Sequence, residues 1–287
     1  MWTEQRLIQN LHELGVREGM VILAHTSLRS IGQIEGGAET LIHAFRAALG
    51  PEGTLLVPAF TYNRIDPACW EFPPATLEEI ERLRAEAPLF DPASSPVDTR
   101  WIGMFPEAVR QQQDAFRGQH PAFSFAAIGA AAQSLTENAP FHFPLGTNSP
   151  LARLYKRKGG ILLIGVGHSV NSSLHLAEVW AEAPYIRRSI SIKTGLDEWS
   201  IMKGSPECSS GFERIEPLLR QSRLIKEGYI GNAKCSLMRI QELVSMAVAL
   251  LRGSPSALLC SNPACHWCVL ARKMTGSALP IEKEEVE

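Results

Sequence analysis

Hydrophobic spacing near the start of the chain predicts a helix followed by a strand–helix–strand unit. Leucines recur on one helix face at Leu7, Leu11 and Leu14, which indicates an amphipathic helix. Uninterrupted apolar runs at 19–25 and 53–60 are typical of buried strands. The segment between them, AETLIHAFRAALG, has helical spacing and ends at a glycine. We expect a βαβ unit with the usual right-handed crossover.

The same reasoning extends to the rest of the chain and predicts an α/β fold. Apolar runs predict strands at 120–129 and 160–167, and the second is the clearest buried strand in the sequence. Two alternating runs at 187–203 predict a β-hairpin. Helical spacing occurs in four further segments: WIGMFPEAVRQQ, SPLARLYKRKG, SSLHLAEVWAEA and RIQELVSMAVALLRG.

The segment 61–100 interrupts this pattern and is predicted to be a long excursion from the core. It is rich in proline and contains one helical piece, TLEEIERLRAEA. Excursions of this length often form lids or binding loops, and the simpler interpretation is a solvated loop. Outside the helical piece its charge is mainly acidic, with Asp66, Asp91 and Asp98 among the acids.

Composition sets the class of protein but does not identify a partner. The chain has 287 residues, of which 45% are hydrophobic and 20% charged, which allows a sizeable core. Lysine and arginine total 28 and aspartate and glutamate 30, so the net charge of -2 gives no electrostatic reason to expect nucleic acid. We also find neither a signal-peptide pattern nor an apolar run near the ~18 residues of a membrane span. We therefore expect a cytoplasmic protein without membrane partners.

The stretch GHSVNSSLHLAEVW, residues 167–180, is the main candidate for acid–base chemistry. His175 and Glu178 are three residues apart and share one face of the predicted helix, at the carboxyl end of a predicted strand. A carboxylate beside an imidazole suits general-base catalysis, although a surface ion pair has the same spacing. A metal site is disfavoured because zincins need His-Glu-x-x-His, and His168 lies across a turn.

Three of the six cysteines have the spacing of metal ligands, in the run LCSNPACHWC. Clustered cysteines in a cytosolic chain indicate a metal before a disulfide, and structural zinc takes four ligands. Besides Cys260, Cys265 and Cys268, the fourth ligand has to come from elsewhere: Cys69, Cys208, Cys235 or His266. Free thiols remain an alternative. A [2Fe–2S] cluster is also formally possible, but it would need a further cysteine downstream.

Six motifs occur in a fixed order along roughly residues 5–250 of the chain. They are VILAHTSLRSIG (21–32), GTLLVPAFTY (53–62), FDPASSPVDTRWIG (90–103), HPAFSFAAIG (120–129), NSPLARL (148–154) and LLIGVGHSVNSSLHLAE (162–178). Together they resemble the aminoglycoside 3-N-acetyltransferases, and six ordered motifs are more specific than any single one. The resemblance implies direct acetyl transfer from acetyl-CoA to the 3-amino group of an aminoglycoside antibiotic, which confers resistance.

The resemblance also implies roles for individual residues. His175 matches the implied base and Glu178 its carboxylate partner, and backbone N–H groups at 26–28 are candidate oxyanion donors. The cofactor is implied to contact His25, Thr26, Ser27, Leu28, Ser124 and Phe125. The substrate is implied to contact Asp66, Asp91, Asp98 and Glu178.

The C-terminus resembles the apramycin-acetylating branch of the family, which is associated with bound zinc. This resemblance supports one structural zinc site at Cys208, Cys260, Cys265 and Cys268. A departure is that Cys260 stands where some relatives are expected to carry histidine, and either side chain can bind zinc.

The implied fold is a single large α/β domain over 1–287, distinct from the GNAT acetyltransferases. It has a central mixed sheet with helices on both faces. Within it we expect a long acidic substrate loop at 61–100 and a small zinc-stabilised C-terminal subregion at 205–270. The chain is expected to be a monomer or a homodimer.

Three other functions fit parts of the sequence. The same fold could acetylate a different amine, in biosynthesis or housekeeping. A zinc-dependent hydrolase could use His168, His175 and Glu178, and chelation would then abolish activity without unfolding. A non-catalytic zinc-stabilised binding module would not bind acetyl-CoA.

Overall fold

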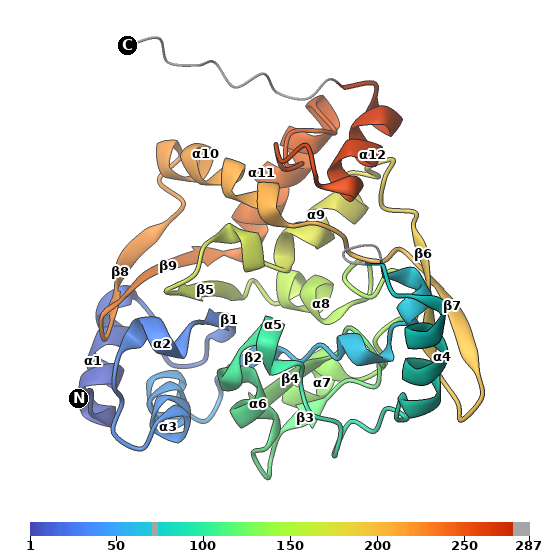
Figure 1. Cartoon of the computed structure of the whole chain (residues 1–287). Coiled ribbons are helices and arrows are strands. Elements are labelled where there is room, and N and C mark those ends of the chain that lie inside the picture. Colours follow the sequence, from blue (N-terminus) through green and yellow to red (C-terminus); the bar gives the residue numbers. More distant parts are fainter. Residues whose placement is uncertain (71–73, 278–287) are drawn as a thin grey trace.

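A seven-stranded mixed sheet forms the centre of the computed structural model, which describes residues 1–70 and 74–277 (Figure 1). The strand order is β3-β4-β2-β1-β5-β9-β8. Strand β1 (Val21–Thr26) is parallel to β2 (Thr54–Pro58) on one side and to β5 (Gly160–Ile164) on the other. The remaining strands pair antiparallel: β3 (Phe116–Arg117), β4 (Phe125–Gly129), β8 (Lys226–Ile230) and β9 (Ala233–Arg239). The predicted α/β class with a mixed central sheet is confirmed.

Alternating strand residues build two hydrophobic cores, one on each face of the sheet. The first core includes Ile22 and Leu162 and lies against α1 (Glu4–Leu14), α3 (Ala38–Leu49) and α6 (Met104–Arg110). The second includes their neighbours Leu23 and Leu163 and lies against α7 (Ala132–Thr136), α8 (Pro150–Lys156), α9 (Ser173–Trp180) and α11 (Ile240–Gly253). Helices therefore cover both faces, as predicted.

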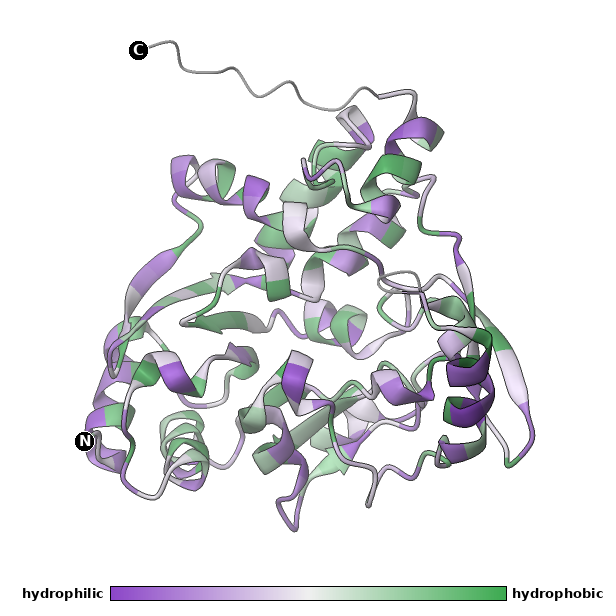
Figure 2. Cartoon of the chain, in the orientation of Figure 1, coloured by the Kyte–Doolittle hydropathy of each residue, from purple (hydrophilic) through white to green (hydrophobic). Residues whose placement is uncertain are grey.

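Hydropathy follows this layering (Figure 2). The central strands are largely apolar, whereas the outlying helix α4 (Leu77–Glu86) is mainly hydrophilic and buries no residue. Within the described ranges, none of the helices combines the length and apolar character needed to span a membrane.

Several predicted elements appear within a few residues of the expected bounds. Leu7, Leu11 and Leu14 are buried along α1, and β1, α3 and β2 form the predicted parallel unit. The predicted hairpin is β6 (Ser189–Lys193) and β7 (Trp199–Lys203), which form a separate two-stranded sheet.

Two predicted elements differ from the structure for local reasons. The run predicted as a strand over 120–129 begins its pairing only at Phe125, because the His120 Nδ1 accepts the N–H groups of Ala122 and Phe123 in a turn. The helix predicted in WIGMFPEAVRQQ breaks at Gly103, whose φ of 90° separates α5 (Thr99–Ile102) from α6.

The segment 61–100 is packed against the sheet at both ends, and its residues 71–73 lie outside the described range. After Thr61 it contains two short 3-10 helices, η1 (Tyr62–Arg64) and η2 (Pro67–Cys69). The buried Arg64 guanidinium donates to the Leu89 carbonyl and the Ser95 hydroxyl. The predicted helical piece is α4, which begins with a capping box of Thr76 and Glu79.

The C-terminal part forms a cap with a small core of its own (Figure 1). The core contains Leu259, Cys260, Cys268 and Ala271, with Tyr185 packed against it. The elements of this part, beside α11, are η4 (Ser210–Ile215), α10 (Glu216–Gln221) and α12 (His266–Thr275).

Glu107 on α6 holds the far end of the 61–100 segment in place. Its buried carboxylate accepts hydrogen bonds from Arg110 at 2.8 and 2.6 Å and from the Val97 N–H at 2.9 Å. Burial raises the pKa of Glu107, but these hydrogen bonds outweigh burial and hold that pKa below its ordinary value of 4.5. The ionised carboxylate therefore stabilises the fold above that pH, and the contribution is lost as pH falls through the lowered pKa.

We predict that Glu107→Ala lowers the free energy of unfolding by about 3 kcal/mol at neutral pH, because it leaves the Arg110 guanidinium buried without its carboxylate. Urea unfolding measures this. Glu86→Ala, which removes one end of the exposed Arg82–Glu86 pair, is the control and should cost less than about 0.5 kcal/mol. Equal decreases in the free energy of unfolding of the two variants would contradict the role given to Glu107. So would a decrease for Glu107→Ala that is as large in acid as at neutral pH.

Candidate active site

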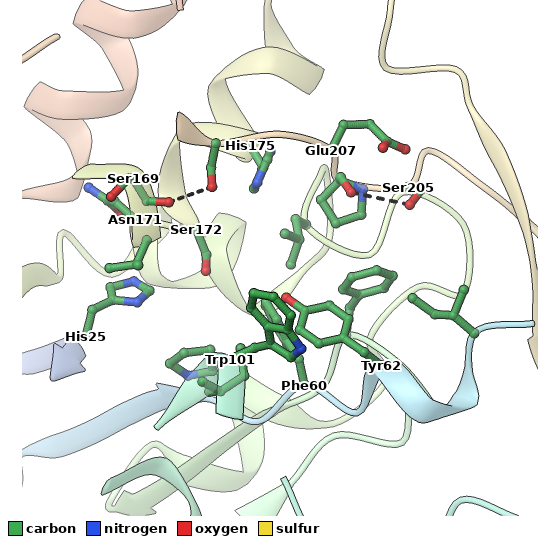
Figure 3. Close-up of a pocket in the computed structure, with 18 of the residues that line it drawn as sticks. His25, Phe60, Tyr62, Trp101, Ser169, Asn171, Ser172, His175, Ser205 and Glu207 are labelled. Atoms are coloured by element: carbon green, nitrogen blue, oxygen red, sulfur yellow. Dashed lines mark hydrogen bonds between the residues drawn. The ribbon is translucent and has the colours of Figure 1, made fainter. Parts of the chain in front are cut away.

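A cleft of about 720 Å³ opens where the three parallel strands end (Figure 3). Because β1, β2 and β5 run in the same direction, their carboxyl ends meet at one edge of the sheet, where open α/β sheets bind ligands. The residues at and after these ends line the cleft: His25, Thr26, Ser27, Pro58, Phe60 and Val166.

The predicted acid–base pair lies at this cleft. Helix α9 places His175 and Glu178 on one face, with Nδ1 of His175 2.7 Å from Oε2 of Glu178. His175 lines the cleft, whereas the buried Glu178 lies behind it. The Phe212 ring meets the imidazole edge to face, with 4.9 Å between the centroids. When Nδ1 carries the hydrogen that Glu178 accepts, Nε2 keeps a lone pair for a bound amine.

Two polar groups at the end of β1 lack a partner among the described residues. Nε2 of His25 and Oγ1 of Thr26 are buried without a hydrogen bond, and both residues line the cleft. Buried polar groups normally have partners, so these two atoms are suited to contact a bound ligand. Burial, with a smaller effect of His168, lowers the pKa of His25 to about 3. The imidazole of His25 is therefore neutral near pH 7.

Ser27 lines the cleft as predicted, but its backbone N–H is already used. That N–H donates to the Ile164 carbonyl at 2.9 Å, and the Ser27 hydroxyl caps α2 (Leu28–Ile31). The Ser27 N–H is therefore not free to stabilise an oxyanion, the role predicted for the backbone N–H groups at 26–28. The Thr26 hydroxyl, by contrast, has no hydrogen-bond partner among the described residues.

Three residues predicted to contact the cofactor do not line the cleft. Leu28 packs against the core beneath β1. The Ser124 hydroxyl is buried and bonds to the Ala59 carbonyl and to Nε of Arg117. Phe125 is fully buried against Phe60, because the strand pleat turns it inward. From this motif, Phe123 is the residue that lines the cleft.

The structure does not bring the three predicted substrate aspartates into the cleft. Asp66 is buried and paired with Arg84 through two hydrogen bonds of 2.9 and 2.7 Å. Asp91 closes its own turn by accepting from Ala93 N–H and Ser94. Asp98 precedes α5 and lies 3.7 Å from Arg100. The sequence shows that these three residues are acidic but does not show their partners. In the structure each carboxylate interacts within its own segment.

The far wall of the cleft consists of residues that sequence reasoning missed. Among the described residues that line the cleft, the single carboxylate is that of Glu207, which pairs with Arg188. The aromatic residues of this wall and of the mouth are Tyr62, Trp70, Trp101 and Trp267. They come from separate segments without a shared periodicity, and the signals for them in the sequence are two motif residues: Tyr62 at the end of 53–62 and Trp101 within 90–103.

The Gly165-Val166-Gly167 turn resembles an anion cradle in sequence, although it lacks the lysine of a P-loop. In the structure an internal carboxylate fills this place: Glu213 accepts the Ser169 N–H at 2.7 Å. A Cβ at Gly167 would lie 2.3 Å from that carboxylate, so a larger residue there would displace the Glu213 side chain. His168, which starts η3 (His168–Val170), is buried with Nε2 2.9 Å from Glu216. Its ring thus faces the cap, which argues against a metal shared with His175.

The four predicted cysteines meet in the cap. Sulfur atoms of Cys208, Cys260, Cys265 and Cys268 all lie within 4.8 Å of one another. Tetrahedral zinc–thiolate geometry needs sulfurs about 3.8 Å apart, from Zn–S bonds of about 2.3 Å. Elsewhere, Cys235 is buried in β9 and Cys69 lines the cleft, so neither joins this group. In the described part of the chain this is the one group of histidine, cysteine or acidic side chains arranged to hold a metal.

A buried arginine supports a negatively charged centre at this cluster. Arg272 is 3% exposed and donates from Nη2 to the carbonyls of Leu259 and Cys260. Its Nε and Nη1 have no hydrogen-bond partner among the described residues. A buried guanidinium needs a counter-charge, and a metal bound by four thiolates carries net negative charge. The donor set and the arginine therefore fit a zinc ion.

The sequence model of the family described as aminoglycoside 3-N-acetyltransferase matches residues 23–252. The chain belongs to this family. It is therefore related throughout most of its length to acyltransferases. Aminoglycoside N(3)-acetyltransferase IV of a Salmonella species is 34% identical over 266 residues, with 90% of each chain covered.

Solved structures of family members superpose on the chain. The apoenzyme of aminoglycoside acetyltransferase AAC(3)-IVa has a TM-score of 0.81 at 33% identity, covering 95% of this chain and 98% of that one. A histidine-to-alanine mutant of AAC(3)-IVa has been solved in complex with a gentamicin. AAC-IIIb, solved as a binary complex with CoASH, has a TM-score of 0.77 at 27% identity, covering 88% of this chain and 97% of that one.

We predict that His25 stays neutral from about pH 5 to pH 8, where an ordinary histidine titrates. Nuclear magnetic resonance of the ring nitrogens should give a midpoint of about 3, against the ordinary 6.5. The unfolded chain takes up this proton near pH 6.5, whereas the folded protein takes it up only near pH 3. His25 therefore lowers the free energy of unfolding as pH falls from 6.5 toward about 3. A midpoint near 6.5 would show that the ring is solvated and would remove the role given to burial.

Proposed function

We propose that this protein transfers the acetyl group of acetyl-CoA to the 3-amino group of an aminoglycoside antibiotic and so confers resistance. The observation that carries the proposal is the buried His175–Glu178 pair facing the cleft, in a chain of this family. The CoASH complex of AAC-IIIb supports acetyl-CoA as the co-substrate. The gentamicin and apramycin complexes of AAC(3)-IVa support an aminoglycoside as the acceptor.

In the proposed mechanism, His175 is the general base. The acceptor amine attacks the thioester carbonyl carbon as its proton passes to Nε2 of His175, and the carbon–sulfur bond then breaks. Glu178, which is held 2.7 Å from Nδ1, stabilises the resulting imidazolium. The proton on His175 can return to the departing coenzyme A thiolate, so that the pair is restored. Direct transfer of this kind needs no acyl-enzyme.

We propose that the two substrates enter from opposite ends of the cleft. His25, Thr26 and Ser27 form one end, and we assign it to acetyl-CoA, with the Thr26 hydroxyl as a donor to the carbonyl oxygen. Glu207 lies toward the other end, and His175 lies between them in Figure 3. We assign that end to the acceptor amine. Asp66, Asp91 and Asp98 then support the fold around the acceptor without contacting it directly.

One observation favours a second candidate, which is the same chemistry on a different amine. The cleft is lined by Arg100 and Arg188 but by the single carboxylate of Glu207, among the described residues. A strongly polycationic acceptor would gain little electrostatic attraction from such a wall. Comparing kcat/KM for gentamicin with that for an acceptor of lower charge separates the two candidates.

We further propose that the chain belongs to the zinc-containing, apramycin-acetylating branch of the family. The four-cysteine cluster and the superposition on AAC(3)-IVa support this. In this proposal 205–270 is a zinc-stabilised subregion of one domain spanning 1–287, with a fold distinct from the GNAT enzymes. Zinc would be held by Cys208, Cys260, Cys265 and Cys268, with a structural role.

We predict that His175→Ala keeps its fold but lowers kcat by about 100- to 10,000-fold, the usual contribution of a general base. Release of the coenzyme A thiol measures turnover, and circular dichroism checks the fold. His43→Ala, which alters an exposed histidine on α3, is the matched control and should turn over like the wild type. Wild-type-like turnover by the His175 variant would rule out its role as the base.

We predict about one zinc ion per chain, given a tetrahedral four-cysteine site. Elemental analysis of the purified protein measures it. Cys268→Ser should lose most of the metal and lower the melting temperature, whereas Cys235→Ala should keep the metal because Cys235 lies outside the cluster. A metal-free wild type whose stability is unaffected by chelator would remove the zinc proposal.

A further inference from the structure

Arg188 joins three parts of the chain that are far apart in sequence. Its Nη1 lies 3.1 Å from both carboxylate oxygens of Glu207, and its Nη2 donates to the Cys69 carbonyl at 2.9 Å. Its guanidinium carbon lies 3.5 Å from the centre of the Trp267 ring. The partners come from the 61–100 segment, the loop after β7 and helix α12. All four residues line the cleft.

Two of these partners adjoin the cysteine cluster. Glu207 precedes Cys208, and Trp267 precedes Cys268. Cys208 belongs to the cluster, while its neighbours Glu207 and Ser209 line the cleft. The cap therefore supplies part of the cleft wall, and Arg188 links that part to the segment carrying Cys69.

We propose that Arg188 is a positioning residue that holds the acceptor-side wall in one piece and aims the Glu207 carboxylate at the acceptor. The inference rests on the proposed function. A guanidinium suits this place because its planar fork can donate in several directions while its face stacks on an aromatic ring. Lysine offers one point charge and cannot make all three contacts at once.

This arrangement separates the two substrates in a measurable way. Glu207, which accepts from Arg188, lies on one side of His175, and His25 lies on the other side (Figure 3). Loosening the Arg188 contacts should therefore weaken acceptor binding while leaving acetyl-CoA binding unchanged. A general loss of folding would alter both.

The test is steady-state kinetics of Arg188→Met, with gentamicin as acceptor and with each substrate varied in turn. We expect KM for the acceptor to rise about tenfold, kcat to fall less than about threefold and KM for acetyl-CoA to stay at the wild-type value, as for lost binding contacts away from the reacting atoms. Arg188→Lys should lie between wild type and Arg188→Met, because it keeps the charge opposite Glu207. Arg187→Met removes the neighbouring exposed arginine and is the matched control with wild-type kinetics.

Metal content and melting temperature of each variant show whether the cap remains folded. If Arg188→Met does not fold, the test is whether Arg188→Lys raises the acceptor KM above the wild-type value while leaving the acetyl-CoA KM unchanged. An unchanged acceptor KM in both Arg188 variants would overturn the inference, and so would an equal rise in both KM values. Absence of acetyl transfer by the wild type would instead contradict the proposed function, so the two failures are distinguishable.

Discussion

The parallel pairing of β1 with β5 is the constraint on which the cleft depends. It sets His25 beside Leu163 and Thr26 beside Ile164, and the Ser27 N–H extends the pairing to the Ile164 carbonyl. Two segments from distant parts of the sequence therefore end at the same edge of the sheet. Because α9 follows β5 through residues 165–172, which include η3, this register also helps to place His175 at the cleft.

The cleft has two walls of different origin. The sheet edge supplies one wall, whose position is set by backbone hydrogen bonds. The opposite wall is assembled from loops and from the cap, through Arg188, Glu207 and Trp267. In the proposed function, acetyl-CoA binds at the wall formed by the sheet edge, and the wall formed by the loops and the cap recognises the acceptor. A metal in the cysteine cluster would then act on recognition by fixing the residues beside Cys208 and Cys268.

The sequence predicted the parts of the site that repeat a local rule. His175 and Glu178 were found from helical spacing and three of the cysteines from ligand spacing, whereas Cys208 was chosen through the family resemblance. Strands β8 and β9 were not predicted, since their runs at 226–239 are polar in part and β8 lies at the edge of the sheet. The role of Asp66 was beyond reach because its partner Arg84 lies on α4 and only tertiary packing brings the two together. Glu207 and Trp267 were also missed, because only tertiary packing brings them to the cleft and neither belongs to a periodic pattern in the sequence.

The central claim is that the cleft transfers acetyl to one particular amine with His175 as base. The most direct measurement is the structure of the product formed from acetyl-CoA and gentamicin by the wild-type protein, by mass spectrometry and nuclear magnetic resonance. The account predicts a single added acetyl group on the 3-amino nitrogen. Acetylation at another nitrogen, or no product with any aminoglycoside while acetyl-CoA still binds, would contradict it.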